Sequence, residues 1–168
     1  VNQIYAHRNM FSLKASTIYH ETQGTYKSKD SHEDKHYIHL LEEIQAYREK
    51  SLKKGYNFVH LGYITIGIIP LIRKGIDASA LGILLDTRHK NFKDQLVSVL
   101  EGPLSNGPIY MEAFPNFVVS LIDPYFSEIL TFLFKTHGLD MKRESEHVQI
   151  AYRMVVRLVN TILPSVYD

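Results

Sequence analysis

The chain has 168 residues, of which 45% are hydrophobic and 22% charged, and its formal net charge is +1. These values are typical of one folded domain with an attachment, and they exclude a chain that is disordered throughout. Because the bulk charge is so small, any affinity for nucleic acid has to come from local basic clusters. The absence of cysteine excludes disulfides, thiolate metal sites and thiol nucleophiles, and it is typical of a reducing compartment such as the cytoplasm.

The N-terminal part of the sequence carries no targeting or membrane signal. No apolar run reaches the roughly 18 to 20 residues that a membrane-spanning helix needs. The chain begins VNQIYAHRN, without an initiator methionine, and we expect it to be a piece of a longer polypeptide. Residues 1–30 are predicted to be an extended arm or linker, because the stretch QGTYKSKDS (23–31) is rich in turn formers and has no period.

Residues 31–55 are predicted to form an amphipathic helix. Ser31 is the expected N-cap, and Glu33 and Asp34 lie where the helix dipole favours negative charge. The segment finishes in lysines and Gly55, which is typical of a helix C-terminus. The apolar residues at helical spacing are Tyr37, Leu40, Leu41, Ile44 and Tyr47.

After residue 55 the pattern changes to that of short strands rich in β-branched and aromatic residues. The expected strands are 57–69, 79–86, 95–100, 109–113, 116–122, 129–136 and 147–159. The last has the cleanest alternation: its even-numbered residues from Val148 to Leu158 share an apolar face, and Arg153 and Arg157 lie on a face that must meet water or an anion. We therefore predict a mainly β fold, a jelly-roll-like antiparallel β-sandwich over 56–163 with an N-terminal helix.

Catalytic and metal-binding motifs are weak. His32, His36 and His39 are spaced to share one face of the predicted helix, but no cysteine or fourth ligand accompanies them, and a solvated helix face is the preferred interpretation. Neither a Gly-x-Ser-x-Gly elbow, nor a phosphate-binding loop, nor a dinucleotide motif is present. We expect no catalysis, no metal and no cofactor.

Basic residues flank the predicted strand 79–86. Arg73 and Lys74 precede it, and Arg88, Lys90 and Lys93 follow it; all five are candidates for phosphate contacts, with Tyr110, Phe114 and Phe117 available for base stacking. Ordinary charged loops and core aromatics remain an equal alternative. The two clusters lie along one edge or at opposite ends of the sheet, depending on how the strands are joined. Asp86 ends the apolar run 80–85, and we expect its carboxylate to accept backbone N–H groups of the next turn or to pair with Arg88.

The segment 60–89, HLGYITIGIIPLIRKGIDASALGILLDTRH, resembles the central signature of the plant-virus movement protein superfamily of the thirty-kilodalton type. The likeness is greatest to the movement domains of pararetroviruses, the badnavirus and caulimovirus group, and it extends to GPLSNGPIYMEAFPNFVVSLID at 102–123. It covers roughly residues 56–160, and Asp86 matches the characteristic aspartate of the family.

This resemblance implies a jelly-roll-like fold related to viral capsid domains and a non-enzymatic role in cell-to-cell transport. The implied partners are single-stranded nucleic acid or virus particles and host plasmodesmal proteins, and the implied locations are plasmodesmata and cytoplasm. A homo-oligomer or tubule is also implied, although no matching residue carries it. The alternative function is a capsid-like structural domain that self-assembles through the same sandwich.

Overall fold

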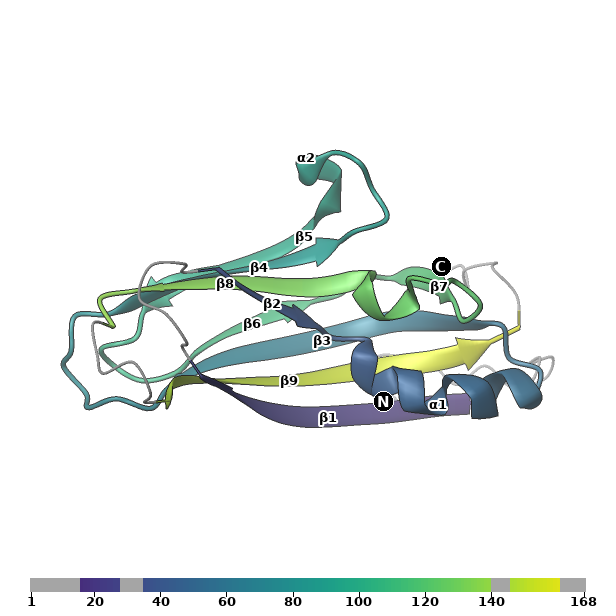
Figure 1. Cartoon of the computed structure of the whole chain (residues 1–168), viewed down its shortest axis with the longest axis horizontal. Helices are drawn as coiled ribbons and strands as arrows, with labels where there is room; N and C mark the ends of the chain where they lie inside the picture. Colours follow the sequence, from purple (N-terminus) through teal and green to yellow (C-terminus); the bar gives the residue numbers. More distant parts are fainter. Residues whose placement is uncertain (1–15, 28–34, 140–145, 161–168) are drawn as a thin grey trace.

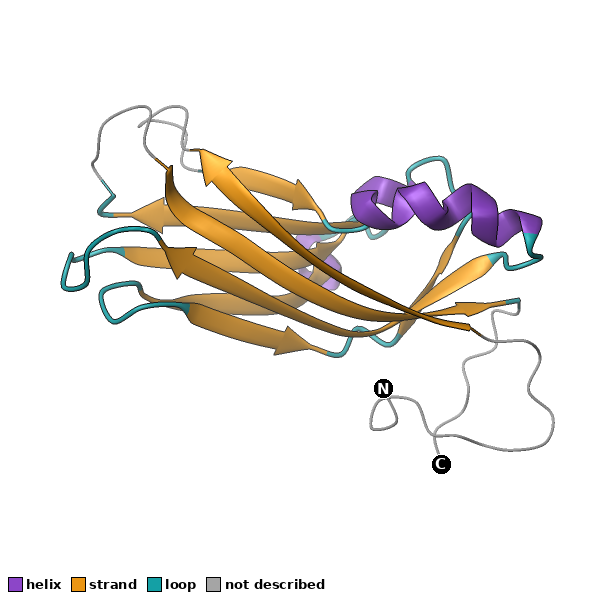
Figure 2. Cartoon of the chain, turned by 90° about the horizontal axis from the view of Figure 1, so that it is seen from below, coloured by secondary structure: helices purple, strands orange, loops and turns teal. Residues whose placement is uncertain are grey.

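The computed structural model describes residues 35–139 and 146–160 in full and the backbone of residues 16–27. The described residues form two antiparallel sheets stacked face to face, with a helix at one side (Figures 1 and 2). This arrangement confirms the predicted mainly β, jelly-roll-like sandwich.

Sheet A has five strands. Its order is β1 (Ser16–Lys27), β9 (Glu146–Val159), β3 (Phe58–Pro70) and β6 (Ile109–Ala113), and β7 (Phe117–Ser120) also pairs with β3. The long strand β3 pairs along its whole length with β9. At its other edge, the first part of β3 pairs with β7 and the second part with β6. Strand β3 therefore pairs with three of the other four strands of sheet A, and β1 joins the sheet through β9.

Sheet B has four strands in the order β2 (His36–His39), β8 (Leu130–His137), β4 (Ser79–Asp86) and β5 (Leu96–Pro103). A short helix, α2 (Phe92–Gln95), lies in the connection between β4 and β5, and a 3₁₀ turn, η1 (Phe126–Glu128), precedes β8. All pairs in this sheet are antiparallel.

The hydrophobic core lies between the two sheets. Gly82 in β4 marks a point of close packing, since a Cβ atom there would lie 2.4 Å from Phe132 Cζ and 3.5 Å from Ile68 Cδ1 of the opposite sheet. The predicted apolar face of the last strand is confirmed, because all of its members are buried: Val148, Ile150, Tyr152, Met154, Val156 and Leu158.

Helix α1 (Glu42–Lys53) is shorter than the predicted helix 31–55, and its C-terminal end is as expected. The prediction was wrong for His36–His39, which form strand β2 and pair with β8. The spacing of Tyr37, Leu40 and Leu41 fits either structure, and pairing with a neighbouring strand outweighs local periodicity. The expected cap Ser31, together with Glu33 and Asp34, lies outside the described residues.

The prediction of an extended arm or linker over residues 1–30 was also wrong in part, because Ser16–Lys27 form strand β1 at the edge of sheet A. Its positions in register with the core-facing residues of β9 include serine, histidine, threonine and glycine, so no apolar alternation is visible in the sequence. The sandwich therefore includes segments on both sides of the helix, not only 56–163. Residues 1–15 lie outside the described part of the chain.

The helix α1 is held against the end of the sandwich by Arg48. Its Nε donates to the carbonyl oxygen of Leu121, and its Nη2 donates to the carbonyl of Asp123 at 3.1 Å. The guanidinium also lies 5.9 Å from the centre of the Phe126 ring in η1. These contacts fix the helix on the sandwich.

Candidate nucleic-acid interface

Arg73 and Lys74 lie in the loop between β3 and β4, and both are exposed. Gly75 follows them with φ +86°, a backbone conformation that glycine adopts without strain, and its N–H donates to the carbonyl of Ser105 at 3.0 Å. The turn therefore holds two adjacent cations at the left-hand end of the sandwich in Figure 1.

Lys90 and Lys93 lie beyond the other end of β4, Lys90 before α2 and Lys93 within it, and both are exposed. Since β4 has eight residues at about 3.3 Å each, the two basic clusters are separated by roughly 25 Å. Figure 1 shows the β3–β4 loop and α2 in different parts of the molecule. Of the two arrangements left open by the sequence, the clusters adopt the one at opposite ends of the strand.

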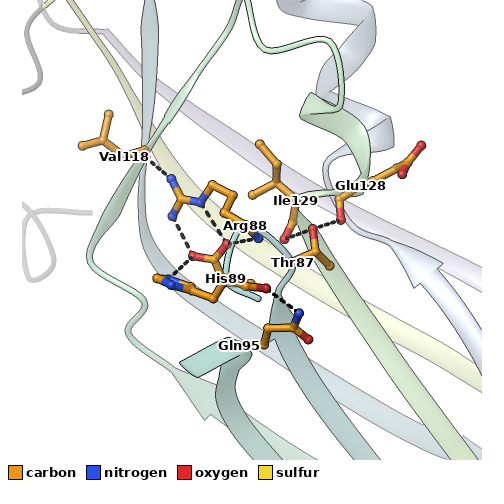
Figure 3. A network of polar contacts seen from close by, with 8 residues as sticks. Thr87, Arg88, His89, Gln95, Val118, Glu128 and Ile129 are labelled. Carbon is orange, nitrogen blue, oxygen red and sulfur yellow. Dashed lines mark hydrogen bonds and ion pairs between the residues drawn. The ribbon is translucent and has the colours of Figure 1, made fainter. Parts of the chain in front are cut away.

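Arg88 is engaged in a network of polar contacts (Figure 3). Its Nε donates to Asp86 Oδ1 at 2.9 Å, its Nη2 to Asp86 Oδ2 at 2.6 Å, and its backbone N–H to Asp86 Oδ1 at 3.2 Å. Both contacts expected for Asp86 from the sequence are thus present. The carboxylate of Asp86 thus accepts two hydrogen bonds from the guanidinium of Arg88 and one from the backbone N–H of the same residue.

The same guanidinium reaches the opposite sheet. Its Nη1 donates to the carbonyl oxygen of Val118 in β7 at 2.7 Å, and its carbon lies 4.6 Å from the centre of the Phe117 ring. Arg88 therefore links the end of β4 in sheet B to β7 in sheet A. We name Asp86, Arg88, Phe117 and Val118 the inter-sheet clamp.

The charge state of the clamp follows from these contacts. Asp86 is only 4% exposed, and this burial by itself would raise the pKa of its carboxyl group. The hydrogen bonds from Arg88 and its positive charge outweigh the effect of burial, so the pKa of Asp86 lies below its usual value. His89 lies 3.7 Å from the same carboxylate and acts in the same direction. Asp86 is therefore ionised at neutral pH.

These contacts make Arg88 a poorer candidate for phosphate binding than the four lysine and arginine side chains in the two loops. Phe117 is also a poorer stacking candidate, because the guanidinium already covers its ring. Thr87, between Asp86 and Arg88, is likewise bound, since its Oγ1 donates to the carbonyl of Glu128 at 3.1 Å and its N–H to that of Ile129 at 2.9 Å.

Tyr110 and Phe114, the other two predicted stacking residues, are 61% and 66% exposed at the β6 edge of sheet A. The Tyr110 ring covers Gly67 in β3, and the Phe114 ring lies 5.2 Å from that of Tyr63. Gly67 is three residues from the end of β3, so Tyr110 lies at the same end of the sandwich as Arg73 and Lys74.

Arg153 extends this surface across sheet A. It is exposed on the outer face of β9, as the alternation of that strand indicates, and pairs in register with Thr65 of β3, which in turn pairs with Glu112 of β6. The sequence predicted that this face meets water or an anion, but it did not show that Arg153 lies two strands from Glu112, the residue between Tyr110 and Phe114 on the same face. Only the pairing of β9, β3 and β6 reveals that neighbourhood.

His60 and Asn116 form a polar contact that the sequence did not predict. His60 is 7% exposed in β3, and its Nε2 lies 2.9 Å from Asn116 Oδ1, at a residue with φ +49° between β6 and β7. Burial lowers the pKa of His60, the charge of Arg157 lowers it further, and the hydrogen bond to Asn116 opposes both. His60 is therefore neutral at physiological pH.

The predicted histidine face is not formed by the described residues. His36 points toward the core, where its ring lies 5.0 Å from that of Phe134, while His39 Nδ1 lies 3.0 Å from Thr131 Oγ1. His32 lies outside the described residues. Across 35–139 and 146–160, no group of three or more histidine, aspartate or glutamate residues is arranged to hold a metal ion.

A family model described as "Viral movement protein (MP)" matches residues 2–167. The chain belongs to the viral movement protein family. It is 27% identical over 114 residues to a movement protein of Figwort mosaic virus (strain DxS) and 28% identical over 131 residues to a genome polyprotein of Petunia vein clearing virus (isolate Shepherd). These matches cover 67% and 76% of the chain but only 35% and 6% of the relatives, so the chain spans a minor part of each.

The solved structures similar to this movement-protein chain are viral jelly-roll proteins. A chain of Desmodium yellow mottle tymovirus matches with a TM-score of 0.57 and 14% identity, covering 98% of this chain and 97% of that one. A chain of Turnip yellow mosaic virus matches with a TM-score of 0.54 and 10% identity, covering 92% and 98%. Likenesses at this level of identity establish the fold, which resembles that of viral capsid proteins.

Proposed function

We propose that this chain is a domain that mediates transport of a virus from cell to cell through plasmodesmata. The family match over residues 2–167 is the observation that carries the proposal. The named movement proteins among its relatives support it further. The proposed places of action are plasmodesmata and the adjoining cytoplasm.

The proposed cargo is single-stranded viral nucleic acid or the virus particle. Arg73, Lys74 and Arg153, together with Tyr110 and Phe114, are the surface that we favour for nucleic acid. Arg73 and Lys74 lie at the same end of the sandwich as Tyr110, and Arg153 shares the outer face of sheet A with the exposed rings. Lys90 and Lys93 form a second, separate contact. Such binding is indifferent to sequence and sensitive to salt.

The role that we propose is non-enzymatic and involves contacts with host plasmodesmal proteins and with further copies of the chain, up to a tubule. The family supports a transport role rather than a catalytic one. Among the residues that the structure describes, no helix has the length and apolar character needed to cross a membrane. The alternative predicted from the sequence, a capsid-like assembly domain, has only the shared fold in its favour, and a fold alone does not carry a function.

The test is to express the chain with a fluorescent tag in leaf epidermis and to record its position relative to the cell wall. Puncta at cell junctions are the expected result. A diffuse signal from folded protein would contradict targeting by this domain. A variant that lacks Arg73 and Lys74 should keep the puncta and lose affinity for single strands, which separates targeting from cargo binding.

A further inference from the structure

Glu112 lies between the two exposed rings of the surface that we favour for nucleic acid. Along β6 and just after it, Tyr110, Glu112 and Phe114 alternate with the buried residues Met111 and Ala113, so all three side chains lie on the outer face of sheet A. A carboxylate is unfavourable in a surface that binds phosphates, because the two charges repel each other. Its position between the rings points to contact with the bases instead.

The ring of Tyr110 is supported by the backbone of the neighbouring strand. Tyr110 pairs in register with Gly67 of β3, where a Cβ atom would lie 2.5 Å from Tyr110 Cε1 and 2.7 Å from Cδ1. The ring is thus held against the sheet, although Tyr110 is 61% exposed. A ring that is already held in place loses little side-chain entropy when a base stacks on it.

A second tyrosine positions the carboxylate of Glu112. Tyr63 Oη donates to Glu112 Oε1 at 2.9 Å, and the Tyr63 ring lies 5.2 Å from the ring of Phe114. Burial and the bond to Glu112 raise the pKa of Tyr63, so its hydroxyl remains a donor at neutral pH. This bond uses one acceptor position, whereas an ionised carboxylate has about four. The carboxylate is therefore held in place and still has acceptor positions for a ligand.

The bases differ in what they present to a carboxylate. Cytosine, adenine and guanine carry an exocyclic amino group, and glutamate accepts a hydrogen bond from the amino group of cytosine in known complexes. Uracil and thymine have no amino group, and their ring N–H lies between two carbonyl oxygens, which a carboxylate repels. In a single strand these edges are open to side chains, because the bases are unpaired. A carboxylate beside a stacked base therefore distinguishes the two groups of bases.

We propose that Glu112 selects single strands whose bases carry an amino group. A base stacks on the Tyr110 ring and donates from its amino group to the carboxylate of Glu112, which lies about 7 Å further along the same face. The phosphates then lie toward Arg73 and Lys74, at the same end of the sandwich as Tyr110. The inference rests on the proposed binding of single strands and adds a base preference, which rings and cations alone do not supply.

The test compares two single strands of equal length, oligodeoxycytidine and oligodeoxyuridine, because cytosine has an amino group where uracil has a carbonyl oxygen. Fluorescence anisotropy at neutral pH and constant salt gives both affinities. The parent chain should bind the cytidine strand about fivefold tighter or more, the lower end of the discrimination that a base-edge contact provides. Glu112→Gln should make the two affinities nearly equal, because an amide offers both a donor and an acceptor.

Two further variants separate base selection from a general effect of charge. Glu101→Gln removes the same charge from an exposed position of β5 in the other sheet, and it should leave the ratio of the two affinities as in the parent chain. Tyr63→Phe keeps the ring but releases the carboxylate of Glu112, so it should reduce the ratio. Circular dichroism and the melting temperature of each variant show whether it is folded.

The outcomes distinguish this inference from the proposed function. Equal affinities of the parent chain for the two strands would overturn the base preference while leaving single-stranded nucleic acid as the cargo. A ratio that persists in Glu112→Gln would also overturn it, because the preference would then come from another part of the surface. A parent chain that binds neither strand would contradict the nucleic-acid cargo itself, and the inference would fall with it.

Discussion

Arg88 Nη2 lies 2.6 Å from Asp86 Oδ2, and the same guanidinium donates to Val118 of the opposite sheet. Asp86, which matches the characteristic aspartate of the family in sequence, is thus the buried residue that holds Arg88 in contact with both sheets. Its position at the end of β4 places the clamp at the start of the loop that carries Lys90 and Lys93. The clamp is a structural device beside a candidate binding loop.

Replacing Asp86 with alanine should reduce the free energy of unfolding by about 1 to 3 kcal/mol, because Arg88 loses its acceptor while it remains partly buried. Urea denaturation measures the loss. Asp94→Ala is the matched control, since Asp94 is an exposed carboxylate on α2 in the same loop. Equal midpoints for the Asp86 variant and the parent chain would show that the clamp contributes nothing.

The stability of the chain should fall as the pH drops through the range in which His60 titrates. The pKa of His60 is lowered in the folded state, so its neutral form contributes stability above the unfolded-state pKa of about 6.5, and this is lost as the pH falls through the folded pKa. His60→Gln should flatten this part of the stability profile.

The measurement is the difference in unfolding free energy between about pH 7.5 and about pH 5, on either side of the ordinary histidine pKa. Asp86 also stabilises the chain less as the pH falls, but in a different pH range. Because its pKa is lowered in the folded state, its contribution to the free energy of unfolding is lost only in acid below about pH 4. An identical profile for His60→Gln and the parent chain would rule out the histidine as the source.

Removing Arg73 and Lys74 together should weaken binding to single-stranded DNA or RNA and reduce the slope of log affinity against log salt by about 1.4, because each phosphate contact to a single strand contributes about 0.7. Removing Lys90 and Lys93 tests the second cluster in the same way. Fluorescence anisotropy at several salt concentrations gives both slopes. If the salt slope is unaltered after a pair of cations is removed, that pair does not contact the phosphates.

Arg88 should behave differently from these four residues. Since its donors are occupied by Asp86 and Val118, Arg88→Ala should lower the melting temperature and leave the salt slope nearly unchanged. A slope that falls as far as for a loop lysine, in a variant of undiminished stability, would return Arg88 to the phosphate contacts predicted from the sequence.

Tyr110→Ala should weaken single-strand binding by about 1 to 3 kcal/mol if a base stacks on the exposed ring. Tyr110→Phe keeps the ring and should bind as the parent chain does. Phe117→Leu serves as a comparison, since the Phe117 ring already lies under Arg88. Equal affinities for the alanine and phenylalanine variants would exclude stacking at this position.

Local patterns predicted the strands with strong alternation and clear turns. The bounds of β4 and β6 agree with the sequence, because each is a short apolar run between turn residues. Strand β1 was missed because it depends on the edge of β9 for its partner rather than on its own alternation. The stretch around Tyr37 fits a helix and a strand equally well, and only pairing with β8 decides between them.

The candidate site was harder to predict for the same reason. Sequence alone places Arg88 beside Asp86 but not beside Val118, which is 30 residues away. It likewise gives no sign of the contact between His60 and Asn116, 56 residues apart. Whether two basic loops lie together depends on strand direction, and β4 separates them. Contacts between distant segments are set by topology, which periodicity does not encode.

The central claim is that this domain supports movement of a virus between cells, and complementation measures it most directly. A fluorescent reporter virus that lacks its own movement gene is introduced into single epidermal cells, with the chain supplied in trans. The account predicts multicellular fluorescent foci, retained by Asp94→Ala and reduced by Asp86→Ala. Infection that stays confined to single cells, although the chain is folded and present, would contradict it.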